Sequence, residues 1–422
     1  MQSLKGKKLL ILAGAPVHCK VVEAARAMGV YTIVTDYLEN SPAKLLADKS
    51  WMFNITDIDA IVERCREEHV DGVLNFCIDP AQRPYVQICE KLGVPCYGDS
   101  KQFNIMTDKP SFKAFCKENG IDVIPTYTID DVKDGFCEYP LFIKPTDSRG
   151  SRGQTLCYTK EEALSAIDVA VKESSNGGVV IEKFMQGKQD FSMTYFVCDG
   201  KAYLTRTCDR YLGRIEDGLN KQCVGCVGPS KYTDFYIQKV HTRVVEFIKK
   251  LGIKNGPLFM QGFVDGETVR FYDPGLRFPG GEYERLLKEI TGVDLMSALI
   301  EFALTGEMSL PDNMECDSYL LGGYHTIQLP ITSRPATIKV FDGMEDIKKD
   351  SRVTVAFNRY SVGETVPKTG DVRQRVCEIA LITKPCESVC DAVRWIQSKL
   401  VVLDDYGNNM LTSLVDPFEL QY

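Results

Sequence analysis

Phe142-Ile-Lys-Pro-Thr-Asp-Ser-Arg-Gly-Ser-Arg-Gly-Gln154 is the stretch of this sequence that says most about the fold. Apolar residues predict a strand over residues 141–144, which ends at Lys144. Gly150 and Gly153 then leave the backbone free to wrap a ligand, because glycine tolerates conformations that other residues avoid. Successive N–H groups of such a loop can bind phosphate oxygens, and Lys144 would add a point positive charge. The stretch therefore predicts a strand followed by a phosphate-binding loop.

Two arginines of the same loop, Arg149 and Arg152, could add charge-assisted hydrogen bonds to a phosphate. The order G-x-x-x-x-G-K-[ST] is absent, so the loop is not a Walker A motif. A basic, glycine-rich surface hairpin is the alternative interpretation of the same residues. The loop by itself leaves both interpretations open.

A second segment, Val180-Ile-Glu-Lys-Phe-Met-Gln-Gly187, continues an apolar strand into alternating polar and aromatic residues. Such a strand end can line a flat, mostly apolar slot with exposed backbone edges. An adenine ring needs that combination of stacking and a few backbone hydrogen bonds. The end of an ordinary strand could have the same sequence. This segment therefore indicates an adenine site only in combination with the other segments.

The third segment runs from Leu258 to Arg277, and its Asp265-Gly266 pair predicts a hairpin between two strands. Alternation along the strands places Gln261 and Asp273 on neighbouring strands, where they could face the same way. Oxygen ligands on adjacent strands are what a Mg²⁺ ion that bridges nucleotide phosphates requires. Arg277 could hold an anionic substrate or the charge that develops on a phosphate.

Together, in this order and spacing, the three segments resemble the ATP-grasp superfamily. The likeness is to the branch of biotin carboxylase, the carbamoyl-phosphate synthase large-chain halves and the amino-acid ligases, and it is most specific over residues 109–277. It implies ATP and Mg²⁺, or Mn²⁺ in its place, with Gln261 and Asp273 as metal ligands. It also implies catalytic roles for Arg277, Lys144 and Arg152. The residues that it assigns to the nucleotide are Lys109, Lys144, Ser148, Arg149, Gly150, Ser151, Gly153, Glu182, Lys183, Phe184, Met185 and Asp190.

The sequence departs from this family at the metal. The family usually carries Glu, Glu, Asn and Arg where this chain has Gln261, Asp273, Gly275 and Arg277. Fewer anionic oxygens should weaken Mg²⁺ binding. Three interpretations follow: one carboxylate acts with a Gln carbonyl, another acid such as Glu282 or Glu284 is recruited, or catalysis has been lost.

The expected fold is α/β and α+β. Short apolar runs alternate with helical patterns over the first ~100 residues, which predicts a doubly wound parallel layer. We expect this N-terminal pre-ATP-grasp domain at 1–106 and a two-lobed ATP-grasp domain at 107–310. Its small lobe would span about 107–184 and its large lobe about 185–310. A C-terminal α+β cap would follow at 311–422.

Composition excludes some classes of protein. The 58 acidic and 50 basic residues give a formal net charge of −8, without a long Lys/Arg run, so we expect no nucleic-acid partner. No apolar stretch reaches membrane-spanning length, so we expect no membrane partner either. The 16 cysteines are scattered, many of them in apolar segments, which predicts reduced thiols and a cytoplasmic location.

Other candidate residues have simpler interpretations. Cys223-Val-Gly-Cys226 has metal-ligand spacing but no second Cys/His pair nearby, so we expect a flexible loop over the substrate rather than a zinc site. His18 follows the first glycine turn and could touch a substrate, whereas His241 lies within a helical pattern and is expected to be structural. Asp79 ends a strand, and we expect it to cap the helix that follows.

The predicted function is an ATP-dependent carboxylate–amine ligase that forms an acyl phosphate and ADP. Its partners would be a small-molecule carboxylate and a small-molecule amine, and the resemblance implies a homodimer. One alternative is a bicarbonate-activating enzyme of the carboxylase or carbamoyl-phosphate synthase kind. The other is an ATP-binding regulatory or scaffold protein that kept the fold without turnover.

Overall fold

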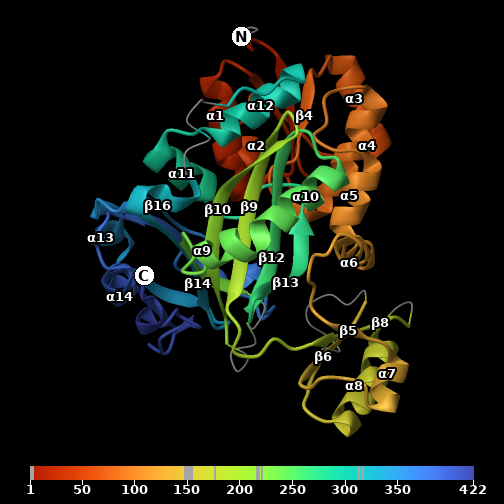
Figure 1. The fold of residues 1–422 in the computed structure, drawn as a ribbon. Coiled ribbons are helices and arrows are strands. Elements are labelled where there is room, and N and C mark those ends of the chain that lie inside the picture. Colours follow the sequence, from red (N-terminus) through yellow and green to blue (C-terminus); the bar gives the residue numbers. More distant parts are fainter. Residues whose placement is uncertain are drawn as a thin grey trace.

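The molecule has three visible parts. The computed structural model describes residues 4–146, 155–174, 177–214, 219, 222–310, 314 and 318–422. Figure 1 shows a helix-covered layer at the N-terminal end, a long sheet through the middle, and a small lobe with α7 and α8 that projects beside the sheet. Helices and strands of the C-terminal region lie on the other side of the sheet.

The N-terminal layer is a parallel sheet, as its sequence pattern predicts. Its strands are β1 (Lys8–Leu12), β2 (Tyr31–Thr35), β3 (Lys49–Trp51) and β4 (Gly72–Leu74), in the order β3-β2-β1-β4. Leu9 to Leu12 are fully buried, because helices cover both faces of a parallel sheet and its strands become continuous apolar runs. The helices of this region are α1 (Cys19–Ala27), α2 (Pro42–Leu46), α3 (Ile58–Glu68), α4 (Gln82–Leu92) and α5 (Ser100–Thr107).

The small lobe is an independent antiparallel sheet with helices on it. The strand order is β5-β8-β6-β7, and α8 packs on β6. A core of its own, around Leu141, Ile143 and Ile181, holds the lobe together. The elements of the lobe are β5 (Thr126–Tyr127), α7 (Ile129–Asp134), β6 (Leu141–Pro145), β7 (Thr155–Cys157), α8 (Lys160–Glu173) and β8 (Val179–Lys183). The preceding helix α6 (Lys109–Glu118) packs on α5 and β13 instead.

The central sheet joins most of the remaining chain, in the order β13-β12-β9-β10-β11-β14-β17-β16, with β19 beside β14. Its strands are β9 (Asp190–Cys198), β10 (Lys201–Leu212), β11 (Cys223–Gly228), β12 (Gly256–Asp265), β13 (Thr268–Gly275), β14 (His325–Ser333), β16 (Val353–Asn358), β17 (Arg375–Thr383) and β19 (Leu411–Thr412). The strands of residues 325–383 therefore extend the same sheet as the hairpin β12–β13.

One face of this sheet is covered by α9 (Thr233–Tyr236) and α10 (Thr242–Leu251), which lie across β9 and β12 in Figure 1. Tyr195 of β9 donates or accepts a 2.6 Å hydrogen bond with His241 Nδ1, so His241 has the structural role that the sequence predicts. Because side chains alternate along a strand, Asp190, Ser192 and Thr194 point to the opposite face.

The C-terminal region folds against the far end of the sheet. A second core forms around Ile327, Val376 and Ile396. Its outer elements are β15 (Ile338–Asp342), α13 (Met344–Lys349), α14 (Val389–Lys399) and β18 (Val401–Asp404), and β15 pairs with β18.

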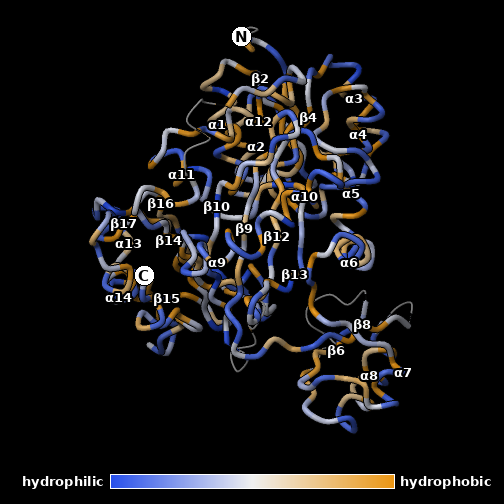
Figure 2. The backbone as a smooth tube through the Cα atoms, viewed as in Figure 1, coloured by the Kyte–Doolittle hydropathy of each residue, from blue (hydrophilic) through white to orange (hydrophobic). Residues whose placement is uncertain are grey.

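A shared core fixes the N-terminal layer to the central sheet. Figure 2 shows apolar segments gathered where β4, α12 and the upper ends of the central strands meet. Two helices that follow β13, α11 (Tyr283–Thr291) and α12 (Leu295–Thr305), make this connection, and α12 packs on β4. Lys7 Nζ also donates to the Leu304 carbonyl at 2.8 Å. Among the described residues, no helix is long and apolar enough to cross a membrane.

The contact between β4 and α12 leaves no room for a side chain at Gly72, where a Cβ would lie 2.1 Å from the Ala303 carbonyl oxygen. We expect Gly72→Ala to lower the free energy of unfolding by about 1–3 kcal/mol, the usual cost of overpacking. Urea unfolding measures this change. Gly280→Ala is the control, since nothing lies within 4 Å of its Cβ position, and an equal loss in both variants would contradict the packing argument.

Candidate functional site

The small lobe brings two lysines onto one carboxylate. Glu182 of β8 is in register with Phe142 of β6, so its side chain lies on the same face as Lys144, two residues further along β6. Glu182 accepts from Lys144 Nζ at 2.6 Å and from Lys113 Nζ of α6 at 2.7 Å. The side chain of Glu182 is buried. Lys144, predicted from the glycine-rich stretch, is thereby held at the inner face of the lobe.

Charge controls the protonation of Glu182. Burial opposes ionisation, but Lys144 and Lys113 outweigh it and lower the pKa of Glu182 to about 2. The carboxylate is therefore ionised at neutral pH and keeps both ammonium groups in place. A phosphate that enters here would compete with Glu182 for the same two cations.

An apolar wall lies beside these charges. Lys144 Nζ lies 5.8 Å from the centre of the Phe142 ring, and the rings of Phe142 and Phe184 are 6.3 Å apart. Met185 is buried, and Lys183 pairs with Glu138 at the lobe surface. Rings next to ammonium groups suit a flat base joined to phosphates. The predicted loop residues Ser148, Arg149, Gly150, Ser151, Arg152 and Gly153 lie outside the described residues.

The hairpin β12–β13 carries the predicted metal ligands. Gln261 and Asp273 lie on neighbouring strands, as predicted, and a β-bulge between Gln261 and Gly262 shifts the antiparallel register so that the two residues are direct partners. Lys109 Nζ, at the start of α6, lies 3.8 Å from Asp273 Oδ1. Burial raises the pKa of Asp273 and Asp79 adds to this, while Lys109 and Arg277 oppose it. Oxygen donors, a lysine and an arginine thus meet at this end of the hairpin.

Asp190, one of the residues assigned to the nucleotide, is engaged within the protein. Its Oδ2 accepts from Arg210 Nη1 at 2.7 Å and from the Tyr272 hydroxyl at 3.0 Å. The same hydroxyl oxygen lies 3.4 Å from Gln261 Oε1, so the network reaches a predicted metal ligand. Burial raises the pKa of Asp190 to about 6, although Arg210 opposes the shift. Asp190 Oδ1 has no hydrogen-bond partner among the described residues.

Arg277 is buried where the hairpin meets the N-terminal layer. Its Nε donates to Asp79 Oδ1 at 2.6 Å, and its Nη1 donates to the Phe278 carbonyl at 2.8 Å. Its guanidinium lies 4.6 Å from the centre of the Phe259 ring. The prediction that Asp79 caps a helix is wrong, because its carboxylate accepts from Arg277 and from the Gln82 side chain instead of from a backbone N–H. No local sequence pattern could predict the contact between Asp79 and Arg277, because the two residues lie far apart in the chain.

Gly275 cannot supply a metal ligand. A Cβ at this position would lie 2.4 Å from the Phe259 ring, its register partner on β12. The ring therefore fills the space in which the family resemblance expects an Asn side chain. The Phe259 ring packs against both Gly275 and Arg277. This packing explains why the chain has glycine where the family usually has Asn.

The two acids proposed as substitutes are also engaged. Glu284 Oε1 and Glu282 Oε2 lie 2.5 and 3.2 Å from Lys20 Nζ of α1. This pairing ties both carboxylates to the N-terminal layer and argues against their recruitment as metal ligands. His18, whose contact with a substrate the sequence suggested, is fully buried, and burial lowers its pKa to about 4.

The sequence reasoning missed three residues of the site: Lys113, Arg210 and Tyr272. Lys113 had a signal, since it lies four residues after Lys109 and so on the same face of α6. Arg210 also had a signal, because Arg206 and Arg210 lie on the same strand, β10, and two arginines in a buried strand are unusual. Tyr272 carries no signal in the sequence that separates it from an ordinary strand tyrosine.

The Cys223–Cys226 pair belongs to a strand, so the predicted flexible loop is wrong. Both thiols lie in β11, and their sulfur atoms are 3.3 Å apart. Among the described residues no group of three or more His, Cys, Asp or Glu side chains could hold a metal ion.

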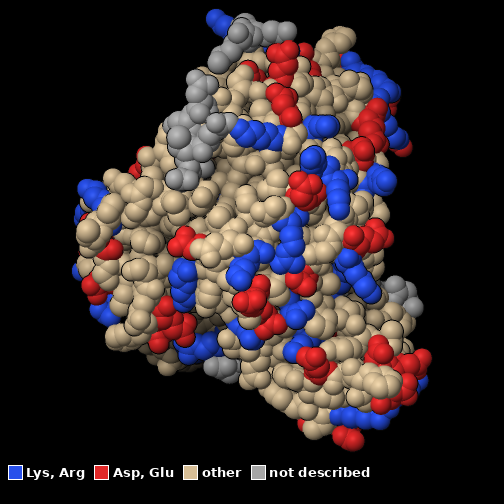
Figure 3. Space-filling model, viewed as in Figure 1, with Lys and Arg blue, Asp and Glu red and all other residues tan. Residues whose placement is uncertain are grey.

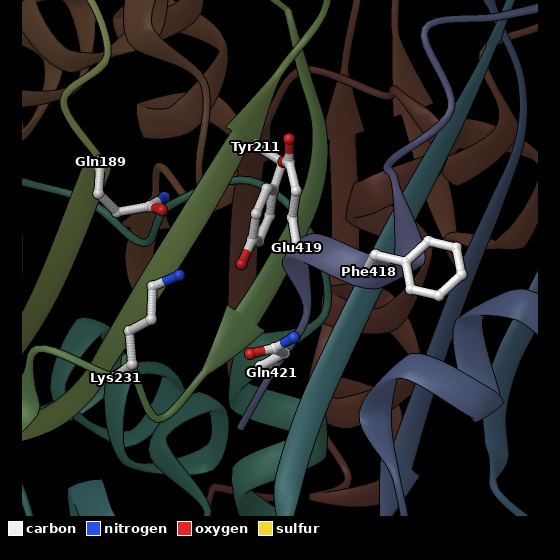
Figure 4. Close-up of a pocket in the computed structure, with 6 residues that line it drawn as sticks. All are labelled: Gln189, Tyr211, Lys231, Phe418, Glu419 and Gln421. Atoms are coloured by element: carbon white, nitrogen blue, oxygen red, sulfur yellow. The ribbon is translucent and has the colours of Figure 1, made fainter.

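A cavity of about 440 Å³ lies beside the C-terminal segment. Figure 4 shows Gln189 and Lys231 on one side of it and Gln421 with the Phe418–Glu419 turn on the other. Tyr211, which lines it, points to the opposite face from Arg210 by alternation. Figure 3 shows Lys and Arg interspersed with Asp and Glu over the face in view.

Glu182 gives a stability test. Its pKa is lowered from 4.5 to about 2, so its contribution to stability is complete above pH 4.5 and is lost as the pH falls towards 2. We expect Glu182→Gln to lower the free energy of unfolding at pH 7 by on the order of 2–3 kcal/mol. The difference from the wild type should shrink between pH 4.5 and 3, as urea unfolding at each pH would measure. Glu289→Gln, at an exposed position, is the control, and a difference independent of pH would refute this assignment.

Comparisons with known proteins agree with this geometry. Residues 108–310 match the family model described as "Carbamoyl-phosphate synthase L chain, ATP binding domain". A formate-dependent phosphoribosylglycinamide formyltransferase of Prochlorococcus marinus subsp. pastoris is 26% identical over 195 residues, which are 44% of this chain and 50% of that protein. The chain thus spans about half the length of the curated relatives it matches.

Solved structures match over nearly the whole chain. The L-amino acid ligase from Bacillus licheniformis has a TM-score of 0.77 at 18% identity, with 95% of this chain and 99% of that one covered. Phosphoribosylglycinamide synthetase from Anaerococcus prevotii has a TM-score of 0.75 at 16% identity, with 95% and 100% covered. At these identities the likeness concerns the fold. Residues 108–310 of this chain are therefore an ATP-grasp domain, within a chain that resembles the branch of biotin carboxylases and amino-acid ligases.

Proposed function

We propose that this protein is an ATP-dependent ligase that joins a small-molecule carboxylate to an amine through an acyl phosphate. One observation carries the proposal: Asp273 lies in register with Gln261 and beside Lys109, in the segment that matches an ATP-binding domain. Lys144 of the small lobe and Lys113 of α6 supply further positive charge. The chemical steps and their residues are inferences from these positions.

The donor set fits one Mg²⁺ ion. Mg²⁺ is usually held by one or two carboxylates together with nucleotide phosphates and water. Asp273 would supply the carboxylate and Gln261 the amide oxygen, while the Phe259 ring excludes a third ligand at Gly275. When bound, the ion would neutralise charge on the phosphates.

The side chains of the chain then position the reactants. Lys144 and Lys109 would neutralise the nucleotide phosphates, because phosphoryl transfer depends mainly on positioning and charge stabilisation. A substrate carboxylate oxygen bonds to the γ-phosphorus as the bond to the β,γ-bridging oxygen breaks and ADP leaves. The amine nitrogen then bonds to the acyl carbon, phosphate leaves, and the nitrogen loses a proton. Arg277, buried beside Phe259, would stabilise the anionic acyl phosphate.

The proposal includes the cellular location and the oligomeric state of the enzyme. The fifteen cysteines in the described part of the chain are free thiols, which suits the reducing cytoplasm. The homodimer implied by the family resemblance stays a prediction, and size-exclusion chromatography with light scattering would measure it.

Release of ADP from ATP and Mg²⁺ tests the function. We expect release to require both a carboxylate and an amine, supplied as pools of amino acids and small organic acids. Asp273→Asn should reduce the rate about 100-fold by removing the carboxylate, while Gln261→Glu should lower the Mg²⁺ concentration needed for half-maximal rate. Asp265→Asn is the matched control, because Asp265 pairs with Lys188 and Arg270 at the turn of the same hairpin.

The same assay separates the alternatives. ADP release that needs bicarbonate, but neither an amine nor another carboxylate, would indicate the bicarbonate-activating enzyme. ATP binding without turnover, unrescued by Gln261→Glu, would indicate the ATP-binding regulatory protein and contradict the ligase.

A further inference from the structure

A β-bulge places Tyr272 next to the predicted metal ligands. Gln261 of β12 pairs with Asp273 of β13, and the register shifts between Gln261 and Gly262. Tyr272 is therefore the extra residue of the bulge, so that Tyr272 and Asp273 both lie opposite Gln261. Strict alternation would turn Tyr272 away from the face of Asp273, whereas a bulge re-aims side chains. As a result, the Tyr272 hydroxyl oxygen lies 3.4 Å from Gln261 Oε1.

The position of Tyr272 is fixed from two sides. Its ring stacks on Phe263 of the same hairpin, with the ring centres 5.2 Å apart. Its oxygen accepts from Arg210 Nη1 at 2.7 Å, and the same nitrogen donates to Asp190 Oδ2 at 2.7 Å. Because a guanidinium has donors only, the Tyr272 oxygen is the acceptor in its contact with Arg210. The hydrogen of the Tyr272 hydroxyl is therefore left for another oxygen.

Two oxygens compete for this hydrogen. Asp190 Oδ2 lies 3.0 Å from the Tyr272 oxygen, and Gln261 Oε1 lies 3.4 Å from it. A hydroxyl has one hydrogen, so it donates fully to only one of them at a time. Asp190 is also paired with Arg210 at 2.7 Å, so its charge stays balanced when Tyr272 donates to Gln261. Donation to Gln261 thus leaves no buried charge without a partner.

The two ends of the Gln261 amide are not equivalent for a metal ion. The amide oxygen has lone pairs that can bind a cation, whereas the NH₂ group has donors only. A hydroxyl whose oxygen already accepts from Arg210 acts as a donor, and a donor contacts the oxygen end of the amide. That oxygen has two lone pairs, so it can accept from Tyr272 and bind a metal together. Partners of this kind orient metal ligands in proteins.

We propose that Tyr272 is a positioning residue that keeps the oxygen of the Gln261 amide towards the metal, and that Arg210 makes Tyr272 a donor. The chain would in this way use a neutral amide where the family usually has Glu, whose two carboxylate oxygens are equivalent and need no such selection. This inference rests on the proposed function for its Mg²⁺ ion. Metal binding requires no turnover, however, and is measured separately.

Binding of Mn²⁺ to the full chain, in the presence of a non-hydrolysable ATP analogue, tests the proposal. Mn²⁺ prefers the same oxygen ligands as Mg²⁺, and electron paramagnetic resonance measures its free concentration. We expect Tyr272→Phe to raise the Kd of Mn²⁺ about 10-fold, because metal ligands that lose an outer partner bind more weakly. The Kd of the analogue without metal should not change, since the Tyr272 hydroxyl acts through Gln261.

The same substitution in a Gln261→Glu background separates positioning from a merely structural role. A glutamate presents an oxygen in either orientation, so Tyr272→Phe should there change the Kd of Mn²⁺ by less than about 2-fold. The four proteins form a double-mutant cycle, which isolates the coupling between the two side chains. An equal loss of Mn²⁺ affinity in both backgrounds is the result expected of a structural tyrosine, and it would overturn the proposal.

Tyr360→Phe is the matched control. Tyr360 is also partly buried, and its hydroxyl donates to the Arg373 carbonyl at 2.6 Å, so its replacement should leave the Kd of Mn²⁺ unchanged. An unchanged Kd in Tyr272→Phe would contradict the proposal, because the hydroxyl would then serve Asp190 alone. So would the absence of Mn²⁺ binding in the wild type. Failure of ADP release together with the expected Mn²⁺ cycle would instead count against the ligase function alone.

Discussion

The contact between the end of β13 and the N-terminal layer is the constraint on which the rest of the site depends. The Leu276 N–H donates to the Gln82 side chain at 2.9 Å, the Phe278 N–H donates to the Phe76 carbonyl at 3.1 Å, and Arg277 pairs with Asp79. These bonds hold the strand that carries Asp273 against a sheet built some 200 residues earlier. The packing of α12 on β4 supports the same junction. Without it, the oxygens on the hairpin would have no fixed position relative to the N-terminal layer.

Cations around the site are held by carboxylates that a bound anion could replace. Lys144 and Lys113 share Glu182, and Lys109 approaches Asp273. Pairing of this kind keeps flexible lysines oriented in the absence of a ligand and avoids leaving buried charge unsatisfied.

Much of this could be predicted from local patterns. The Asp265-Gly266 turn and the alternation around it predicted the hairpin, because a short turn fixes the register of the strands next to it. That register alone would pair Gln261 with Tyr272, and only a β-bulge between Gln261 and Gly262 brings Gln261 opposite Asp273. Contacts that depend on distant segments could not be predicted in the same way. Asp79 was expected to cap a helix, and its partner Arg277 lies in another part of the chain. Cys223 and Cys226 were expected in a loop, but pairing with β10 and β14 makes their segment a strand.

The sequence by itself determined the parallel N-terminal layer, the hairpin of the metal ligands and the position of Lys144 at a strand end, since each rests on local periodicity and turn chemistry. Only the tertiary structure decided which charges meet. Glu182 holds two lysines because three elements converge on it, and Gly275 is barred from a side chain by the Phe259 ring on the neighbouring strand. Burial and charge pairing depend on all surrounding atoms at once, and no local pattern of residues contains that information.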